Sequence, residues 1–284
     1  MEWSVPKFPL DTLSDDGLDW LTEHGSWLTR AVSRTVSDGI DALTGALVAV
    51  PPWAAIAVAS LVTWKIGGRR VGLLTLAGLL FLWNLRLWQA TVETLVLVVL
   101  ATVAALAIGI PVGIACALNR RAWQAVSPVL DMMQTLPSFV YLIPALPFFG
   151  LGAVSACFAT IVFSVPPVIR LTALGIRSVP AELVEACDAF GGSATQKLLK
   201  VQLPLALPTI MAGVNQTMML ALSMVVIAAM IGAGGLGRAV WQSIQRLEAG
   251  AGFEAGIGIV IVAVILDRTT QALAARARPP GTLA

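Results

Sequence analysis

The chain has 284 residues, of which 57% are hydrophobic and only 12% are charged, and its mean hydropathy is +0.86. A soluble domain carries roughly 25% charged residues, and so large an apolar excess leaves too little polar surface to cover a water-soluble core. The net charge of +2 excludes the strongly basic surface of a nucleic-acid-binding protein. Composition therefore predicts an integral membrane protein with no nucleic-acid partner.

Residues 1–44 differ from the rest of the chain, because they carry 11 of the 34 charged side chains. We expect an extracytoplasmic tail that contains an amphipathic helix. From Trp20 onward, apolar residues recur at helical spacing: Leu21, Leu28, Val32, Val36, Ile40 and Leu43. Such a helix lies on a membrane, on a partner, or against its own membrane domain. Its low basic content weakens the case for attraction to anionic lipid.

Beyond residue 45, long stretches carry no charge. A span needs about 20 mostly apolar residues, and the sequence predicts an all-α membrane protein with about seven transmembrane helices. They fall in residues 46–64, 71–85, 94–119, 132–169 (two spans divided at Gly150-Leu-Gly152), 201–237 and 255–266. The predicted domains after the tail are two accessory helices in 45–88, a core in 89–275 and a cytoplasmic tail in 276–284.

The distribution of Lys and Arg predicts the orientation. If the N-terminus lies outside, 12 of the 18 Lys and Arg side chains fall in cytoplasmic segments and six fall outside. Cytoplasmic loops of membrane proteins are enriched in these residues. We therefore expect the N-terminus outside, the C-terminus in the cytoplasm, and the polar connection 171–208 in the cytoplasm.

The first half of this connection predicts a short helix. Pro180 suits the first turn of a helix. Three acidic residues follow at three-residue steps on one face: Glu182, Glu185 and Asp188. Acidic residues early in a helix also suit its dipole. Gly191-Gly192 is a typical helix end.

The second half predicts another helix. Ser193 and Gln196 have the spacing of a capping box, and we expect the helix that they start to run to Pro204. A helix, a sharp turn and a second helix, all exposed to the cytoplasm, are typical of a docking element.

This segment resembles the EAA motif of the permease subunits of ABC importers. The motif is Glu-Ala-Ala, three residues, Gly, nine residues, Ile, one residue, Leu-Pro, and the chain departs from it at Cys187 and Val201, which keep small size or apolarity. In that family the motif forms the coupling helix, which sits in a groove on a separate ATPase subunit. The resemblance implies these ATPase-coupling residues: Glu182, Glu185, Ala186, Cys187, Gly191, Leu203 and Pro204.

Longer runs narrow the resemblance to permeases for glycine betaine, proline betaine and choline. These runs include residues 134–142, 221–226, 230–237 and 266–271, and the resemblance covers nearly all of 45–275. It implies the type I ABC importer permease fold and a homodimer with a central pathway in the bacterial plasma (inner) membrane. It also implies two copies of an ABC ATPase subunit, an extracytoplasmic substrate-binding protein, and a use in osmoprotection.

The sequence predicts no catalytic residue, cofactor or metal site in this chain. Its three cysteines lie far apart, without a CxxC pair, and no GxxxxGK[ST] occurs, so we expect another subunit to hydrolyse ATP. The segment 232–237 matches GxGxxG, but a dinucleotide site needs a preceding strand and a membrane span precedes it here. We interpret its glycines as a close-packed turn, either part of an outer gate, a binding-protein contact, or a plain turn: Gly232, Gly234, Gly235 and Gly237.

Polar and aromatic residues within spans are the candidates for the substrate pathway, since polar groups are costly there. A quaternary ammonium favours aromatic faces, and a betaine carboxylate favours hydrogen-bond donors. The candidates are Ser138, Phe139, Tyr141, Asn215, Met219 and Ser223. For each polar residue the alternative is a hydrogen bond between helices.

Two alternative functions stay open. A permease for another small solute, such as an amino acid, would share Glu185, Gly191 and Pro204 and differ in its pathway residues. An ion-coupled secondary transporter belongs to a different class. It needs clustered His or carboxylate side chains within spans, which the long uncharged runs disfavour.

Overall fold

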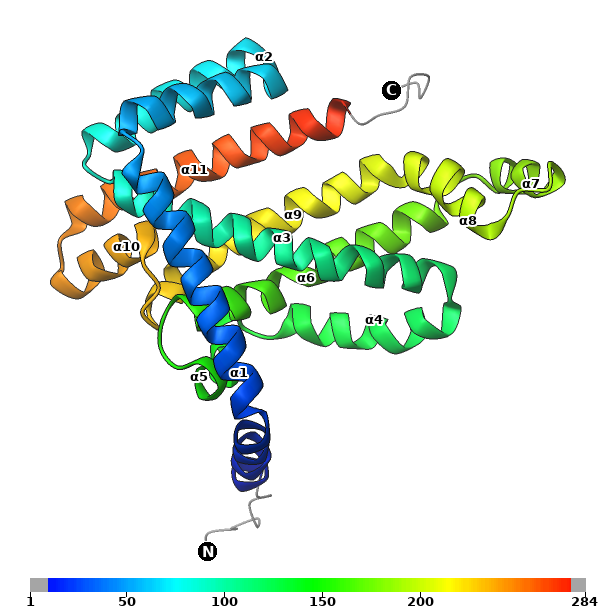
Figure 1. Ribbon diagram of the computed structural model, residues 1–284, viewed down its shortest axis with the longest axis horizontal. Helices are drawn as coiled ribbons and strands as arrows, with labels where there is room; N and C mark the ends of the chain where they lie inside the picture. Colours follow the sequence, from blue (N-terminus) through cyan, green and yellow to red (C-terminus); the bar gives the residue numbers. More distant parts are fainter. Residues whose placement is uncertain (1–9, 277–284) are drawn as a thin grey trace, which may run out of the picture.

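The computed structural model describes residues 10–276, and within them it contains helices and no strand (Figure 1). The helices are α1 (Leu10–Ala49), α2 (Pro52–Asn84), α3 (Trp88–Leu118), α4 (Arg120–Thr135), α5 (Leu142–Phe149), α6 (Ala153–Arg177), α7 (Ala181–Ala189), α8 (Ala194–Gln196), α9 (Leu203–Ala229), α10 (Gly235–Arg246) and α11 (Ala249–Arg276). A 3-10 turn, η1 (Ser138–Tyr141), precedes α5, and a π-helical stretch, η2 (Lys197–Gln202), joins α8 to α9. The all-α prediction is confirmed. The predicted tails lie partly outside the described residues, as do most side chains before Thr29.

Three long helices, α3, α6 and α9, form the centre of the bundle (Figure 1). Small residues let them approach closely. A Cβ on Gly113 of α3 would lie 2.6 Å from Cβ of Thr172 in α6, and one on Gly213 of α9 would lie 3.2 Å from Cα of Val168. Gly109 and Gly113 form a GxxxG pair, a common way to bring two membrane helices together.

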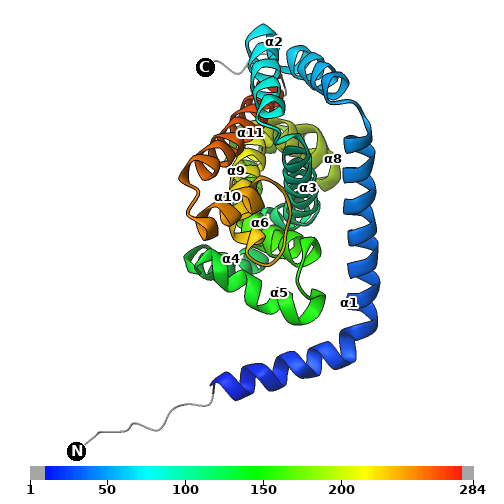
Figure 2. The ribbon, with the colours of Figure 1, turned by 90° about the vertical axis from the view of Figure 1, so that its left-hand side faces the viewer.

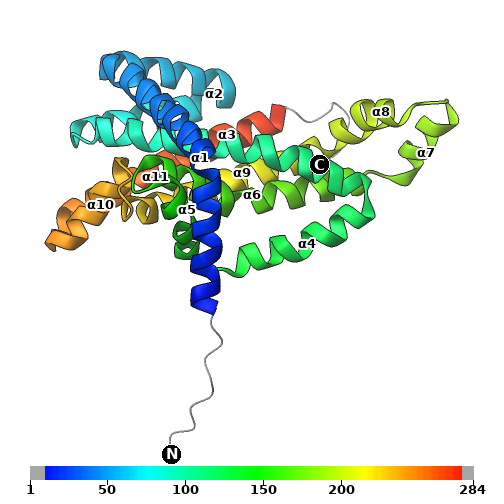
Figure 3. The ribbon, with the colours of Figure 1, turned by 60° about the horizontal axis from the view of Figure 1, so that its bottom comes forward.

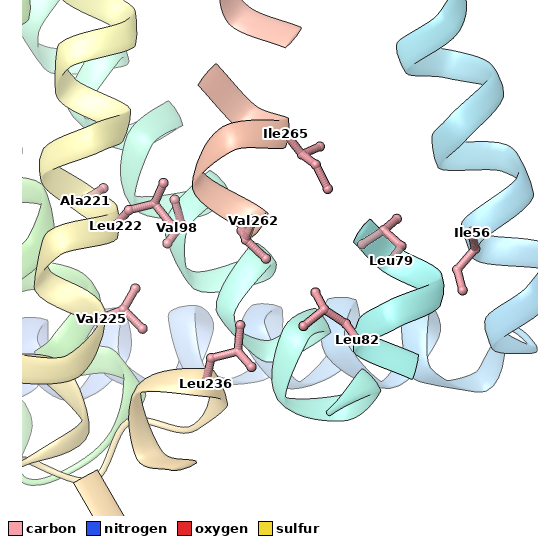
Figure 4. Packing of buried hydrophobic residues seen from close by; sticks show 10 residues of the cluster. All are labelled: Ile56, Leu79, Leu82, Val98, Ala221, Leu222, Val225, Leu236, Val262 and Ile265. Carbon is pink, nitrogen blue, oxygen red and sulfur yellow. The ribbon is translucent and has the colours of Figure 1, made fainter. Parts of the chain in front are cut away.

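A cluster of buried side chains joins the centre to the peripheral helices (Figure 4). It draws on five elements, α2, α3, α9, α10 and α11: Ile56, Leu79, Leu82, Val98, Ala221, Leu222, Val225, Leu236, Val262 and Ile265. Since α10 contributes Leu236, which is fully buried, this short helix is part of the core packing.

The predicted spans 46–64 and 71–85 correspond to one helical hairpin. Pro51 separates α1 from α2, so 46–64 is not a single helix. Within α2 the chain reverses at Gly68, whose φ is +77°, and its arms pack on each other, with Ile56 beside Leu79. Each arm of about 16 residues is about 24 Å long, shorter than a hydrocarbon core of about 30 Å.

The predicted fourth span is also bent. Arg120–Thr135 and Ser138–Phe149 meet at an angle of 114°. Within residues 10–276, five helices are long and apolar enough to cross a membrane, or six if this bent pair counts as one span. The seven predicted spans included the two arms of α2 as separate spans. The number of apolar segments therefore agrees with the prediction, whereas the geometry of α2 and of the fourth span differs from it.

Helix α1 runs across the bundle instead of along it (Figures 2 and 3). Its residues Val36 and Ile40 pack on Val92 and Val96 of α3 and on Cys157 of α6. Of the alternatives for the amphipathic helix, the structure therefore supports packing on its own membrane domain.

The bundle has two distinct ends (Figure 1). Helix α7 projects from one end, and α10 lies at the other. We refer to these as the α7 end and the α10 end.

Candidate functional site

Within the predicted segment 171–208, residues 178–202 project from the α7 end and are called the coupling segment below; their side-chain hydrogen bonds are all local. Pro180 precedes α7, and none of the residues Ala181–Ala189 is buried. Gly191 has a φ of +73°, a conformation that side-chain-bearing residues rarely adopt. The helix end predicted at this glycine is confirmed.

The turn after α7 is held by local polar bonds. The Ser193 hydroxyl accepts from the Gln196 amide at 3.2 Å, and the Gln196 side chain accepts from the Ser193 amide at 2.8 Å, as the capping-box pattern predicts. Lys197 Nζ lies 2.7 Å from a carboxylate oxygen of Asp188. The first turn of the second helix is thereby fixed to the end of the first.

The second helix does not end at Pro204, contrary to the prediction. It continues through η2 into α9, and Leu203 donates its amide to the Leu198 carbonyl five residues back. Pro204 has no amide to donate, and a π-helical stretch accommodates such a break in the hydrogen-bond ladder. The coupling segment is thus continuous with a membrane helix.

An open groove of about 560 Å³ lies between α7 and the second helix. Three of the predicted coupling residues line it, Ala186, Cys187 and Pro204, together with Leu183, Phe190, Gly192, Gln196, Lys200, Val201 and Leu205. Phe190 is 93% exposed. The groove therefore presents apolar surface that this chain leaves uncovered.

The remaining predicted coupling residues have other surroundings. Glu182 and Glu185 are exposed on α7, whereas Leu203 packs against the buried cluster of Ile176, Ala206 and Ile210. The acidic pair faces solvent, and Leu203 anchors the segment to the bundle.

The glycine turn, residues 230–234, and the start of α10 occupy the opposite end. Gly232 and Gly235 have φ values of +97° and +82°. A Cβ on Gly237 would overlap the Val225 carbonyl and lie 2.7 Å from its carbon. The expected close-packed turn is confirmed as geometry, because Gly237 lies against α9 while Gly234 and Gly235 lie against Glu93 and Thr94 of α3.

The pathway candidates near α5 differ in exposure. Tyr141 is buried, donates its hydroxyl to the Met133 carbonyl, and meets Phe163 edge-to-face at a centroid distance of 5.5 Å. Phe139 is 50% exposed, and Ser138 is half-buried. Only Phe139 presents an open aromatic face.

The candidates on α9 do not share one environment. Met219 and Ser223 are exposed. Asn215 points instead toward α11, where its side-chain amide donates to Asp267 Oδ1 at 2.9 Å. Its role in the structure is the interhelical hydrogen bond that was the alternative to pathway lining.

Sequence reasoning missed two sets of positioning side chains. Glu93 and Thr94 of α3 bond the start of α10. Arg177, at the end of α6, donates to the carbonyls of Cys116 and Ala117 and lies 4.9 Å over the Trp123 ring. No local pattern reveals these contacts, since each joins residues more than 50 positions apart.

Among the described residues, no group of three or more His, Cys, Asp or Glu side chains is arranged to hold a metal ion. The architecture is that of a helical membrane protein with a projecting segment and an open apolar groove at one end and a tightly packed turn at the other.

Comparison with known proteins gives this architecture its family. Residues 109–279 match the model of the binding-protein-dependent transport system inner membrane component, and the chain belongs to this family. It is 47% identical over 273 residues to the glycine betaine/proline betaine transport system permease protein ProW of Escherichia coli (strain K12), covering 96% of this chain and 77% of that protein.

Two further similarities extend the match. The glycine betaine/carnitine transport permease protein GbuB of Listeria monocytogenes serotype 1/2a (strain 10403S) is 47% identical over 279 residues, covering 97% of this chain and 99% of that protein. A structure of the MetNI methionine ABC transporter superposes with a TM-score of 0.63 at 22% identity, covering 68% of this chain and 96% of that chain. The latter confirms the type I ABC importer permease fold.

Proposed function

We propose that this chain is the permease subunit that imports glycine betaine or a closely related quaternary amine in an ATP-driven importer. The observation that carries the proposal is the 47% identity to glycine betaine permeases, which extends over 96–97% of the chain. So long a match is not confined to one part of the fold and extends over both ends of the bundle.

The groove at the α7 end supports docking of a separate ATPase. Its walls are apolar, Phe190 stands exposed beside it, and Glu182 and Glu185 are exposed on the same helix. Such a surface suits a partner with an apolar contact patch and a basic rim. We propose two ATPase copies, one for each permease of a homodimer.

An exposed strip on α9 supports the homodimer and its pathway. Met219 and Ser223 are exposed although they lie within a membrane helix, and η1, with the exposed Phe139, packs near α9 through Tyr141 and Met224. A second copy facing this strip would enclose a route lined by neutral polar, thioether and aromatic groups. These groups suit a zwitterion better than an ion.

The charge distribution supports an orientation with the α7 end in the cytoplasm. Lys197 and Lys200 lie in the coupling segment, and Arg120 and Arg121 begin α4 at the same end. Positive residues favour the cytoplasmic side. The α10 end would then face the binding protein, with the glycines of 232–237 as part of an outer gate.

Competition among solutes tests the substrate. The complete importer is reconstituted in vesicles with its ATPase and binding protein. Uptake of radiolabelled glycine betaine is then measured in the presence of unlabelled choline, proline betaine or an amino acid. We expect the quaternary amines to compete and the amino acid not to. Competition by the amino acid alone would favour the other-solute alternative.

A blocking substitution tests the pathway. Met219→Trp places a large ring on the exposed strip of α9, and Val103→Trp places the same ring on α3, where Val103 is 57% exposed. We expect uptake to fall for M219W and to persist for V103W. Equal uptake by the two variants would contradict the assignment of the α9 strip.

A further inference from the structure

Helix α10 begins without a cap of its own. The first amides of a helix have no partner within it, and an N-cap side chain usually supplies one. The N-cap here is Gly234, which has no side chain. The amides of Gly235 and Leu236 belong to buried residues, so water does not replace the missing cap.

Helix α3 supplies both missing acceptors. Glu93 Oε2 accepts from the Gly235 amide at 2.6 Å, and Thr94 Oγ1 accepts from the Leu236 amide at 2.8 Å. Gln89 donates its side-chain amide to Glu93 Oε1 at 3.0 Å and so orients the carboxylate. A carboxylate at a helix N-terminus also interacts favourably with the helix dipole.

The fit between the two helices depends on glycine. A Cβ on Gly235 would overlap Thr94 Oγ1 and lie 3.1 Å from the Thr94 amide nitrogen, and a Cβ on Gly234 would overlap Glu93 Oε2. The two glycines and the two acceptors therefore form one complementary contact between α3 and α10.

The glycine turn itself is bonded on its other sides. The Ile231 carbonyl accepts from the Gly152 amide at 2.8 Å. Arg238 of α10 donates to the carbonyls of Gly232 and Ala233 at 2.8 and 3.2 Å. The turn and the start of α10 are thus one well-bonded unit, and Glu93 and Thr94 are the side chains that attach it to α3.

We propose that Glu93 and Thr94 are positioning residues for transport, which make the glycine turn and α10 move together with α3 when the α10 end opens and closes. This inference rests on the proposed role of the glycines as an outer gate. Because α3 is bonded to the start of α10, a movement of α3 also moves the glycine turn. Without the two acceptors, the start of α10 separates from α3 and the movement is not transmitted.

Paired variants separate the hydrogen bond from the shape. Thr94→Val removes the hydroxyl acceptor at nearly constant shape, and Thr94→Ser keeps it. Glu93→Leu removes the carboxylate, and Glu93→Gln keeps one acceptor oxygen. Hydrogen–deuterium exchange of the Gly235 and Leu236 amides reports the contact directly in the complete importer.

We expect amide exchange at 235–236 to rise about tenfold in T94V and E93L, the factor that corresponds to one lost hydrogen bond. T94S and E93Q keep exchange near wild type. Solute uptake per ATP hydrolysed falls in T94V and E93L only. Exchange in the coupling segment stays unchanged in all four, since it lies at the other end of the bundle.

Two results overturn the inference. Unchanged exchange at 235–236 in T94V shows that the hydroxyl does not hold α10, and faster exchange with unchanged uptake per ATP shows that the contact has no role in transport. Failure of the wild-type importer to take up any quaternary amine contradicts the proposed function instead. The exchange measurement still decides whether the contact holds α10.

Discussion

The two ends of the bundle are stabilised in opposite ways. At the α7 end, the bonds of the coupling segment join residues at most nine positions apart, such as Asp188 and Lys197, and α7 is wholly unburied. At the α10 end, the side-chain bonds that attach α10 to α3 join residues 142 positions apart, such as Glu93 and Gly235. The shape of the coupling segment therefore depends mainly on its own residues, whereas the attachment of the glycine turn to α3 exists only within the assembled bundle.

An added methyl group should have a large effect where the packing is long-range and little effect where the surroundings are open. Gly237→Ala places a Cβ against the Val225 backbone, which must shift, and such overpacking costs about 1–3 kcal/mol. We expect a clear fall in the thermal unfolding temperature of the purified protein.

The matched control is Gly256→Ala in α11, where nothing lies within 4 Å of an added Cβ. Replacing glycine by alanine inside a helix stabilises it by up to about 1 kcal/mol. Equal unfolding temperatures for the two variants would mean that α10 does not pack on α9 as described.

A change at Gly191 should act locally. Gly191→Val puts a β-branched residue at a φ of +73°, which costs about 1–2 kcal/mol, whereas Asn tolerates this region better. We expect an importer that carries G191V to hydrolyse ATP with little solute uptake. An importer that carries G191N should keep more of its coupling, measured as solute uptake per ATP hydrolysed. An unfolding temperature that falls as far as in G237A would contradict the local character of the segment.

Ser193→Ala removes one half of the capping box and should cost about 1 kcal/mol. Because the box lies outside the bundle, the cost appears as faster hydrogen exchange of the Gln196 amide and not as global unfolding. Ser193→Thr keeps a hydroxyl acceptor and serves as the control. Exchange that is equally fast in both variants would show that the hydroxyl is not the cap.

The smallest effect is expected at the Asp188–Lys197 pair. Their side chains are 51% and 25% exposed, and surface salt bridges contribute about 0–1 kcal/mol. A double-mutant cycle with Asp188→Asn and Lys197→Met measures the coupling energy, which should shrink as salt concentration rises. A larger, salt-independent energy would mean that the pair is more buried than its exposure indicates.

The same contrast explains what the sequence predicted. Ser193, Gln196 and Gly191 reveal their roles through spacing of a few residues, so the coupling segment was predicted in detail. The reversal at Gly68 was missed because two uncharged runs flanking Lys65, Arg69 and Arg70 look like two ordinary spans.

Long-range partners were beyond the sequence. In the sequence, Glu93 looks like an ordinary carboxylate at the end of a membrane span. Its role as a hydrogen-bond acceptor emerges only when α10 folds back onto α3. Asn215 and Met219 are four residues apart on α9, a spacing that predicts a shared helical face. In the structure, however, the Asn215 side chain bonds to Asp267 of α11, whereas Met219 is exposed. Which face of a buried helix meets which neighbour depends on the packing of all the helices.

In the proposed function, ATP hydrolysis by a subunit docked at the α7 end drives betaine uptake through this chain. The decisive measurement is radiolabelled glycine betaine uptake into vesicles that contain the permease, its ATPase and its binding protein, with and without ATP. We expect accumulation only with ATP, and its loss in the G191V importer despite continued hydrolysis. Accumulation without ATP, or full uptake by the G191V importer, would show that the proposed coupling is wrong.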